Sequence, residues 1–218
     1  MSYKPFMEKT IWVILAAFVI SCTPTKIIVP LKEGQVQVGA TLGRPQINTG
    51  SLPLLGVYAA KGLSESNTAY GAAQLSSALF GAIQIDAGVV KGLRPSQGFA
   101  PGFSYSYGWN VFFSARDYAV RVYPEAGVNM FWQRGPHILN ISSNSWVDPT
   151  WFLTEYGRGQ ILSPSLGAGY RLRYKWFEVQ AEYKIVNPIR KIHIPQAYIP
   201  STLGLGGRGF YWGAAINF

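Results

Sequence analysis

The sequence predicts an all-β protein that folds as a closed, antiparallel, up-and-down transmembrane β-barrel of ten strands. The first observation is composition, since 48% of the 218 residues are hydrophobic and only 13% are charged, against roughly 25% charged residues in an average soluble domain. The second is that no run of ~18 or more apolar residues, as a spanning helix needs, follows the first two dozen residues. The third is a period-two alternation of apolar and polar side chains, which indicates strands. A chain that meets lipid without spanning helices must pair its backbone groups in a closed barrel.

The first residues read as a secretory signal. Lys4 and Lys9 precede the apolar stretch IWVILAAFVI, and the small residues of SCTPT follow it. This order of basic, apolar and small-residue regions predicts a leader over residues 1–21 that is removed from the mature protein. The alternative is an N-terminal membrane anchor, for which ten apolar residues fall short of the ~17 that a span requires.

Cys22 is the only cysteine of the chain and directly follows this apolar stretch. A cysteine in this position resembles the lipid-modified first residue of bacterial lipoproteins. Ser21 fits the lipobox of that family, whereas Val19 and Ile20 depart from its usual leucine and small residue. The resemblance implies acylation of Cys22, with residues 22–34 as a lipid-anchored periplasmic tether and the anchor in the periplasmic leaflet.

Ten segments are expected to be strands, and residues 35–218 to form one barrel domain. Four of them, 118–133, 160–174, 177–187 and 207–218, carry an unbroken apolar face opposite a polar one and are long by soluble standards. Tryptophans near strand ends suit interfacial girdles. In chain order the expected strands are 35–43, 52–63, 67–75, 81–91, 102–114, 118–133, 137–143, 160–174, 177–187 and 207–218.

An eight-stranded barrel is the alternative, because the segments 35–43 and 137–143 are the weakest of the ten. In that version LRPSQGFAPG, 134–159 and 188–206 are extracellular, while SSALFG, ARD and KW are short periplasmic turns. A soluble β-protein also alternates. Strand length, and a polar face that mixes charges of both signs with glycine and serine, favour the membrane barrel.

The last strand, GRGFYWGAAINF, carries a specific motif. It alternates to a terminal Phe218, with Phe210 and Trp212 on the same face. Such an ending resembles the closing strand of bacterial outer-membrane barrels, which implies recognition by the barrel assembly machinery and pairing with the first strand. The stretch VPLKEGQVQVGATLG is similar to the passage from tether to first strand in small barrel lipoproteins.

Inward-facing charges of both signs are expected on neighbouring strands. In a narrow lumen, unpaired charges are costly, so these side chains are expected to form a salt-bridged network that fills the barrel. A selective channel is the alternative. The set comprises Asp86, Arg121, Glu125, Arg171, Arg173, Glu178, Glu182 and Lys184.

The net charge of +9 can indicate nucleic acid, but a secreted barrel meets lipopolysaccharide phosphates instead. The candidate contacts are Arg158, Arg190, Lys191 and Arg208 in or beside outer loops, although these charges could equally keep the loops solvated.

Together these features favour a non-catalytic outer-membrane barrel lipoprotein that is an accessory or structural subunit of a larger outer-membrane protein complex. No cofactor, metal or nucleic acid is expected. The alternatives are a lipopolysaccharide-modifying enzyme, a small pore, or an adhesin. An enzyme would draw on His137 or His193, a serine among 142, 143 and 145, and Asp148 or Glu155; an adhesin would use Trp146, Trp151 and Phe152 as exposed loop residues.

Overall fold

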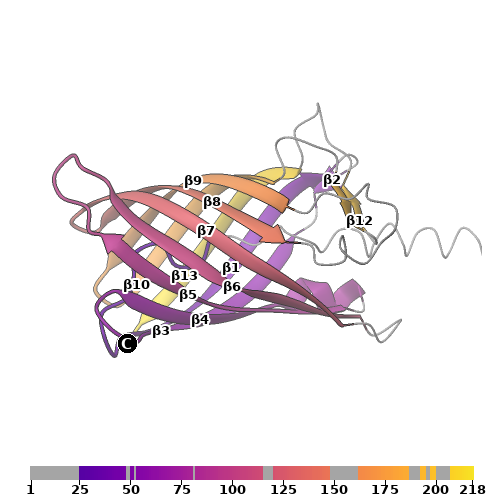
Figure 1. Cartoon of the computed structure of the whole chain (residues 1–218), viewed down its shortest axis with the longest axis horizontal. Helices are drawn as coiled ribbons and strands as arrows, with labels where there is room; N and C mark the ends of the chain where they lie inside the picture. Colours follow the sequence, from indigo (N-terminus) through magenta and orange to yellow (C-terminus); the bar gives the residue numbers. More distant parts are fainter. Residues whose placement is uncertain are drawn as a thin grey trace, which may run out of the picture.

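The computed structural model shows a closed β-barrel (Figure 1). It describes residues 25–47, 50–51, 53–80, 82–114, 120–147, 162–186, 192–194, 197–199 and 207–218. The expected leader, Cys22, Arg158, Arg190 and Lys191 lie outside these residues.

Ten strands form the wall, each paired antiparallel with its neighbours in chain order. The two-residue β2 (Gly50–Ser51) pairs only with the end of β1, and β11 (Ile192–Ile194) pairs with β12 (Ala197–Ile199) as a separate hairpin. The wall strands are β1 (Val36–Ile47), β3 (Leu54–Gly62), β4 (Asn67–Gln74), β5 (Ala82–Arg94), β6 (Gly102–Ser114), β7 (Val120–Arg134), β8 (His137–Val147), β9 (Leu162–Tyr174), β10 (Phe177–Val186) and β13 (Gly207–Asn217).

The ten-strand prediction is therefore confirmed and the eight-strand alternative is wrong. β1 and β8, the two doubtful members, have 12 and 11 residues. The eight-strand version placed LRPSQGFAPG and 188–206 on the same, extracellular side of the membrane. That assignment is also wrong, because the connection 95–101 lies at the barrel end opposite to 187–206.

The barrel closes where β1 pairs with β13, in a register that sets Val38 opposite Ile216. The Val36 N–H donates to the Phe218 carbonyl over 3.1 Å, and the Phe218 N–H donates back over 2.8 Å. Closure leaves no sheet edge with unpaired backbone N–H and C=O groups. Lipid could not form hydrogen bonds with such groups.

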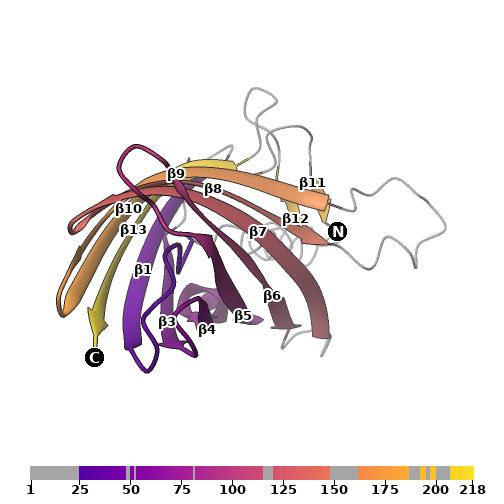
Figure 2. The same cartoon turned by 60° about the vertical axis from the view of Figure 1, so that its left-hand side comes forward.

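The two ends of the barrel differ. We call the end where β1 begins and β13 finishes the proximal end; it also carries the connections 63–66, 95–101, 135–136 and 175–176. The opposite, distal end carries the connections 48–53, 75–81, 115–119, 148–161 and 187–206. Figures 1 and 2 show the C-terminus at the proximal end. The 3₁₀ helix η2 (Leu75–Phe80) lies at the distal end, and no helix of the described residues is long and apolar enough to span a membrane.

The wall is apolar outside and polar inside. On β9, Leu166 is 47% exposed whereas Arg171 is 2% exposed. The same segregation occurs on β7, β10 and β13, as predicted. A soluble barrel would place its large hydrophobic side chains in the lumen, so this arrangement fits a barrel surrounded by lipid.

Two tryptophans, Trp109 and Trp212, lie away from the strand ends at which an interfacial girdle was expected. Trp176 lies in the proximal turn and Trp132 near the proximal end of β7. Trp109 and Trp212 instead lie midway along β6 and β13, because outward aromatic positions occur along the whole length of these strands.

Candidate functional site: the filled lumen

The lumen contains a segment of the chain itself. Residues 25–31, which precede β1, run inside the wall instead of away from it, and the exposed residues 32–34 connect them to β1. Ile28 is 0% exposed, and Ile27 and Leu31 are equally enclosed. We expected residues 22–34 to form a tether in the periplasm; residues 25–31 of that range are instead enclosed by the wall, because both their apolar side chains and their polar backbone find partners there.

The apolar side chains of this segment pack against the inner face of the wall. Ile27 and Leu31 belong to one cluster, whose wall members are Tyr58, Ala60, Ala72, Val90 and Ala215. Ile28 contacts a second cluster with Phe131 and Ile138. Burial of such side chains contributes ~1.5–3 kcal/mol each, so the apolar part of the segment favours its place in the lumen.

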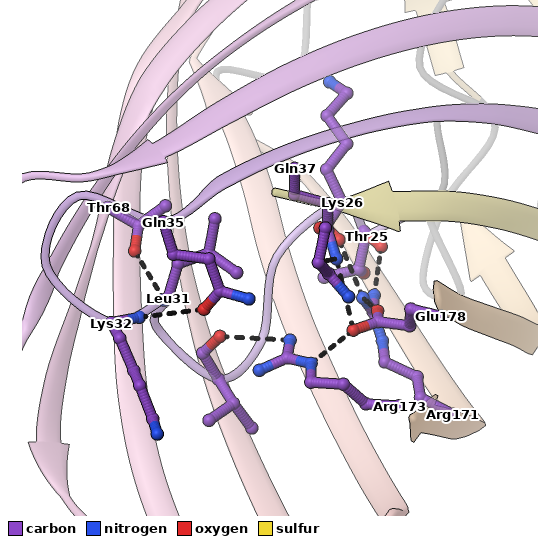
Figure 3. Close-up of polar contacts among 12 residues, drawn as sticks. Thr25, Lys26, Leu31, Lys32, Gln35, Gln37, Thr68, Arg171, Arg173 and Glu178 are labelled. Carbon is purple, nitrogen blue, oxygen red and sulfur yellow. Dashed lines mark hydrogen bonds and ion pairs between the residues drawn. The ribbon is translucent and has the colours of Figure 1, made fainter. Parts of the chain in front are cut away.

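Wall side chains satisfy the backbone of the segment (Figure 3). Arg171 donates to the carbonyls of Thr25 and Lys26, the second over 2.7 Å. Arg173 donates to the Val29 carbonyl over 3.3 Å. Buried backbone groups need partners, and the two arginines supply them where no strand pairing is possible.

Further bonds come from hydroxyl groups. Ser104 donates to the Ile28 carbonyl over 2.6 Å, and the Leu31 N–H donates to Thr68 Oγ1 over 2.8 Å. The segment is thus held from several sides of the barrel.

Lys26 supplies the one charged side chain of the segment that points into the lumen network. Its Nζ lies 2.5 Å from Asp86 Oδ2, with the two residues 7% and 1% exposed. Gln84 donates to the other Asp86 oxygen over 3.1 Å, and the Tyr70 ring lies 5.4 Å from the ammonium. This buried ion pair joins the segment to β5.

Glu182 binds the end of the segment that lies deepest in the barrel. Its carboxylate accepts bonds from the Thr25 N–H and the Thr25 hydroxyl, both at 2.8 Å, and from Ser142 at 2.9 Å. The hydroxyl oxygens of Thr25 and Ser142 lie 3.2 Å apart. Thr25 is therefore fixed by both its backbone and its side chain.

The predicted charge set is assembled in part into one network. Glu178 bridges Arg171 at 2.9 Å and Arg173 at 2.5 Å. Glu125 instead accepts bonds from the amides of Asn110 and Asn144, at 2.6 and 2.5 Å. The two remaining members, Arg121 and Lys184, both have interaction partners, and Lys184 is 1% exposed.

Aromatic side chains cover one side of the lumen toward the distal end, on the neighbouring strands β6, β7 and β8. Phe112, Tyr123 and Trp146 are buried, with ring centroids 5.6 to 6.0 Å apart. Trp146 was expected to be an exposed loop residue. That expectation is wrong, because β8 continues to Val147 and turns this side chain inward; Trp151 and Phe152 lie outside the described residues.

Inward glycines make room for other rings. A Cβ added to Gly39 would lie 2.6 Å from the Tyr58 ring, and one added to Gly88 would lie 2.7 Å from the Tyr70 hydroxyl. The many glycines of the polar face thus allow large side chains to lie flat against the wall.

The residues considered for catalysis are not brought together. His137 lies on the outward face of β8, with Nδ1 2.6 Å from the Tyr170 hydroxyl, whereas Ser142 faces inward toward Glu182. His193 lies in β11, while Asp148 and Glu155 lie outside the described residues. No group of three or more histidine, cysteine or acidic residues in the described chain could hold a metal ion.

The closing-strand residues lie as the sequence suggests. Phe210, Trp212 and Phe218 all point outward, and Phe218 is joined to Val36 at the seam. Arg208 lies near the distal end of β13, paired with Gln46 and Ile185 in the two neighbouring strands.

Fold and lumen together define a transmembrane β-barrel filled by its own N-terminal segment. The barrel is similar to the translocator domain of the autotransporter NalP from Neisseria meningitidis (10% identity, 98% of this chain and 96% of that one, TM-score 0.45). It is also similar to the outer-membrane protease OmpT from Escherichia coli (9%, 89% and 99%, TM-score 0.39) and to a de novo designed transmembrane barrel (12%, 87% and 99%, TM-score 0.35). These similarities concern barrel architecture, and nothing about activity follows from them. No protein-family model and no curated protein sequence matches the chain.

Proposed function

We propose that this protein is a bacterial outer-membrane lipoprotein barrel without catalytic activity, which serves as an accessory or structural subunit of a larger outer-membrane protein complex. The observation that carries the proposal is the filled lumen. A barrel whose interior is occupied by residues 25–31 offers partners its outer wall, its two ends and its lipid, and not a bore.

The filling argues against a small pore. A buried ion pair at Asp86 and hydrogen bonds at Arg171 and Glu182 join the segment to the wall. Removal of one partner from such a pair leaves the other charge buried and unpaired, which costs ~3–5 kcal/mol. Solutes would have to displace a segment that is held at several points.

The lipid-modifying enzyme is also less favoured. General acid–base chemistry needs a base within hydrogen-bond reach of the proton that it removes. The Ser142 hydroxyl and the Glu182 carboxylate are instead bonded to Thr25, and His137 faces the opposite side of the wall.

The outer-membrane location rests on features that support one another. An apolar wall requires a membrane, the predicted leader directs the chain out of the cytoplasm, and the terminal strand resembles a signal for the barrel assembly machinery. Lipids, including lipopolysaccharide, would surround the wall. The distal Arg208 would contribute one cation toward their phosphates, in a contact weakened by salt.

The test is purification of the tagged, full-length protein from membranes in mild detergent, followed by mass spectrometry and native mass measurement. We expect a larger barrel protein to be recovered in fixed stoichiometry. The control is an unrelated small barrel with the same tag, which should not recover that partner. Recovery of the protein as a monomer would overturn the subunit proposal, and stable ionic steps of the purified protein in planar bilayers would overturn the non-conducting reading.

A further inference from the structure

The lumen segment has a direction, and we propose that it carries the N-terminal part of the chain through the barrel. On this reading the chain before Thr25 leaves the barrel at the distal end. Cys22, with any lipid that it bears, then lies at the membrane face opposite to the C-terminus. The inference requires only that the barrel spans a membrane, and it is independent of the accessory role proposed above.

The C-terminal half of the segment lies at the proximal end. Leu31 is bonded to Thr68, the second residue of β4, which begins at that end. Val29 is bonded to Arg173, the next-to-last residue of β9, which finishes there. Both contacts therefore lie within about one residue of the proximal rim.

The N-terminal half lies much deeper. Lys26 pairs with Asp86, the fifth residue of β5 counted from its distal end. Thr25 is bonded to Glu182, the sixth of the ten residues of β10 counted from its proximal end. Between Leu31 and Thr25 the chain has thus climbed from the rim to about the middle of the wall.

The chain at Thr25 still points toward the distal end. Thr25, Lys26 and Ile27 form no turn or bend, so the chain still runs away from the proximal rim where the described residues begin. The proximal side of Thr25 is also occupied by Arg171 and Arg173, which bond both Glu178 and carbonyls of the segment itself.

The remaining distance matches the remaining chain. Four residues of β10 lie beyond Glu182, and in a strand tilted by ~40° they rise ~10 Å along the barrel axis. The three residues from Cys22 to Pro24 span at most ~10 Å when extended. Cys22 would then reach the distal mouth, where acyl chains could enter the adjacent leaflet.

This route changes the expected position of the anchor. The resemblance to barrel lipoproteins implied a lipid in the periplasmic leaflet. If the proximal end, which holds the C-terminus, faces the periplasm, the segment delivers Cys22 to the cell surface instead.

The experiment compares three epitope tags in otherwise unchanged full-length protein. One is inserted between Thr23 and Pro24, one between Lys175 and Trp176 at the proximal turn, and one within the connection 148–161 at the distal end. Antibody binding is measured on intact and on permeabilised cells, and heat-modifiable migration on gels verifies folding. Because each end carries its own marker, the comparison holds whichever end faces outward.

We expect the tag after Thr23 to behave as the distal marker does, with antibody binding to intact cells equal to that marker and different from the proximal one. A tag that follows the proximal marker would overturn the proposal. A tag that binds antibody only after the barrel is unfolded would overturn it as well, since residue 23 would then lie within the lumen.

A second measurement checks the route itself in membranes. In a Cys22→Ala background, Thr25→Cys together with Ser142→Cys should form an intramolecular disulfide, because the two hydroxyl oxygens lie 3.2 Å apart. The matched control replaces Ser142→Cys by Ser143→Cys on the outward face, and it should remain reduced. Absence of the disulfide in the first pair would show that the segment does not occupy the lumen, and the proposal would fall.

Discussion

Replacement of Lys26 by methionine tests the contact that joins the lumen segment to the wall. Lys26→Met keeps most of the side-chain volume and removes the charge. Asp86 would be left with the Gln84 amide at 3.1 Å as its bonded partner among the described contacts, in a position that is 1% exposed. An uncompensated buried charge destabilises a protein by ~3–5 kcal/mol. We expect the free energy of unfolding to fall by about this amount, which is a change of two to three and a half decades, roughly, in the folding equilibrium at ~1.4 kcal/mol per tenfold.

The double variant Lys26→Met with Asp86→Asn separates the ion pair from packing. Removal of both charges leaves no buried carboxylate without a partner, so most of the lost stability should return. The double-mutant cycle formed by the two single variants and the double variant should therefore yield a large coupling energy. The assay is reversible urea unfolding in lipid vesicles, followed by tryptophan fluorescence. Lys32→Met is the matched control, because Lys32 belongs to the same segment but is exposed; we expect a change within ~0.5 kcal/mol. The reasoning is refuted if Lys26→Met behaves like this control, or if the double variant is as unstable as the worse single variant.

Three further changes test the remaining parts of the structure. Arg171→Ala should lower the unfolding midpoint more than Arg171→Lys, because the guanidinium bonds two backbone carbonyls and Glu178 together; equal effects in the same urea assay would contradict this role. Deletion of Phe218 should reduce the amount of heat-modifiable barrel, since the seam loses both of its bonds to Val36, and normal levels would show that the terminal residue is dispensable. Cys22→Ala should abolish metabolic labelling with acyl chains, whereas full labelling would remove the lipoprotein proposal.

The wall could be predicted from the sequence because alternation is a local property. The strand expected at 102–114 has these bounds in the structure. β8 was predicted to stop at 143 but continues to Val147, since Ser143 and Ser145 are polar residues on the outward face and interrupt the apolar pattern. The strand was therefore assigned too short, and Trp146 with it to a loop.

The lumen segment could not be predicted in the same way, because its contacts join residues far apart in the chain, from 37 positions between Leu31 and Thr68 to 157 between Thr25 and Glu182. One signal was nevertheless present. Asp86 lies opposite Ala72 and Asn110 on the neighbouring strands, and Glu182 lies opposite Gly169 and Tyr211. Neither carboxylate has a cation directly opposite it on a neighbouring strand. Glu178, by contrast, lies directly opposite Arg173, and this pair follows from the strand register.

The width of the barrel explains why a chain segment occupies it. Eight strands enclose a lumen that side chains can just fill, and the diameter grows with strand number. The ten-stranded wall is wider, and many of its inward positions are small, such as Gly102, Ser104 and Ser142. Two of these hydroxyls bond residues of the segment directly, Ser104 to Ile28 and Ser142 to Thr25. Small inward residues therefore create the space and also the polar partners that an extended backbone needs, so the wall is suited to a passing chain more than to a plug made of its own side chains.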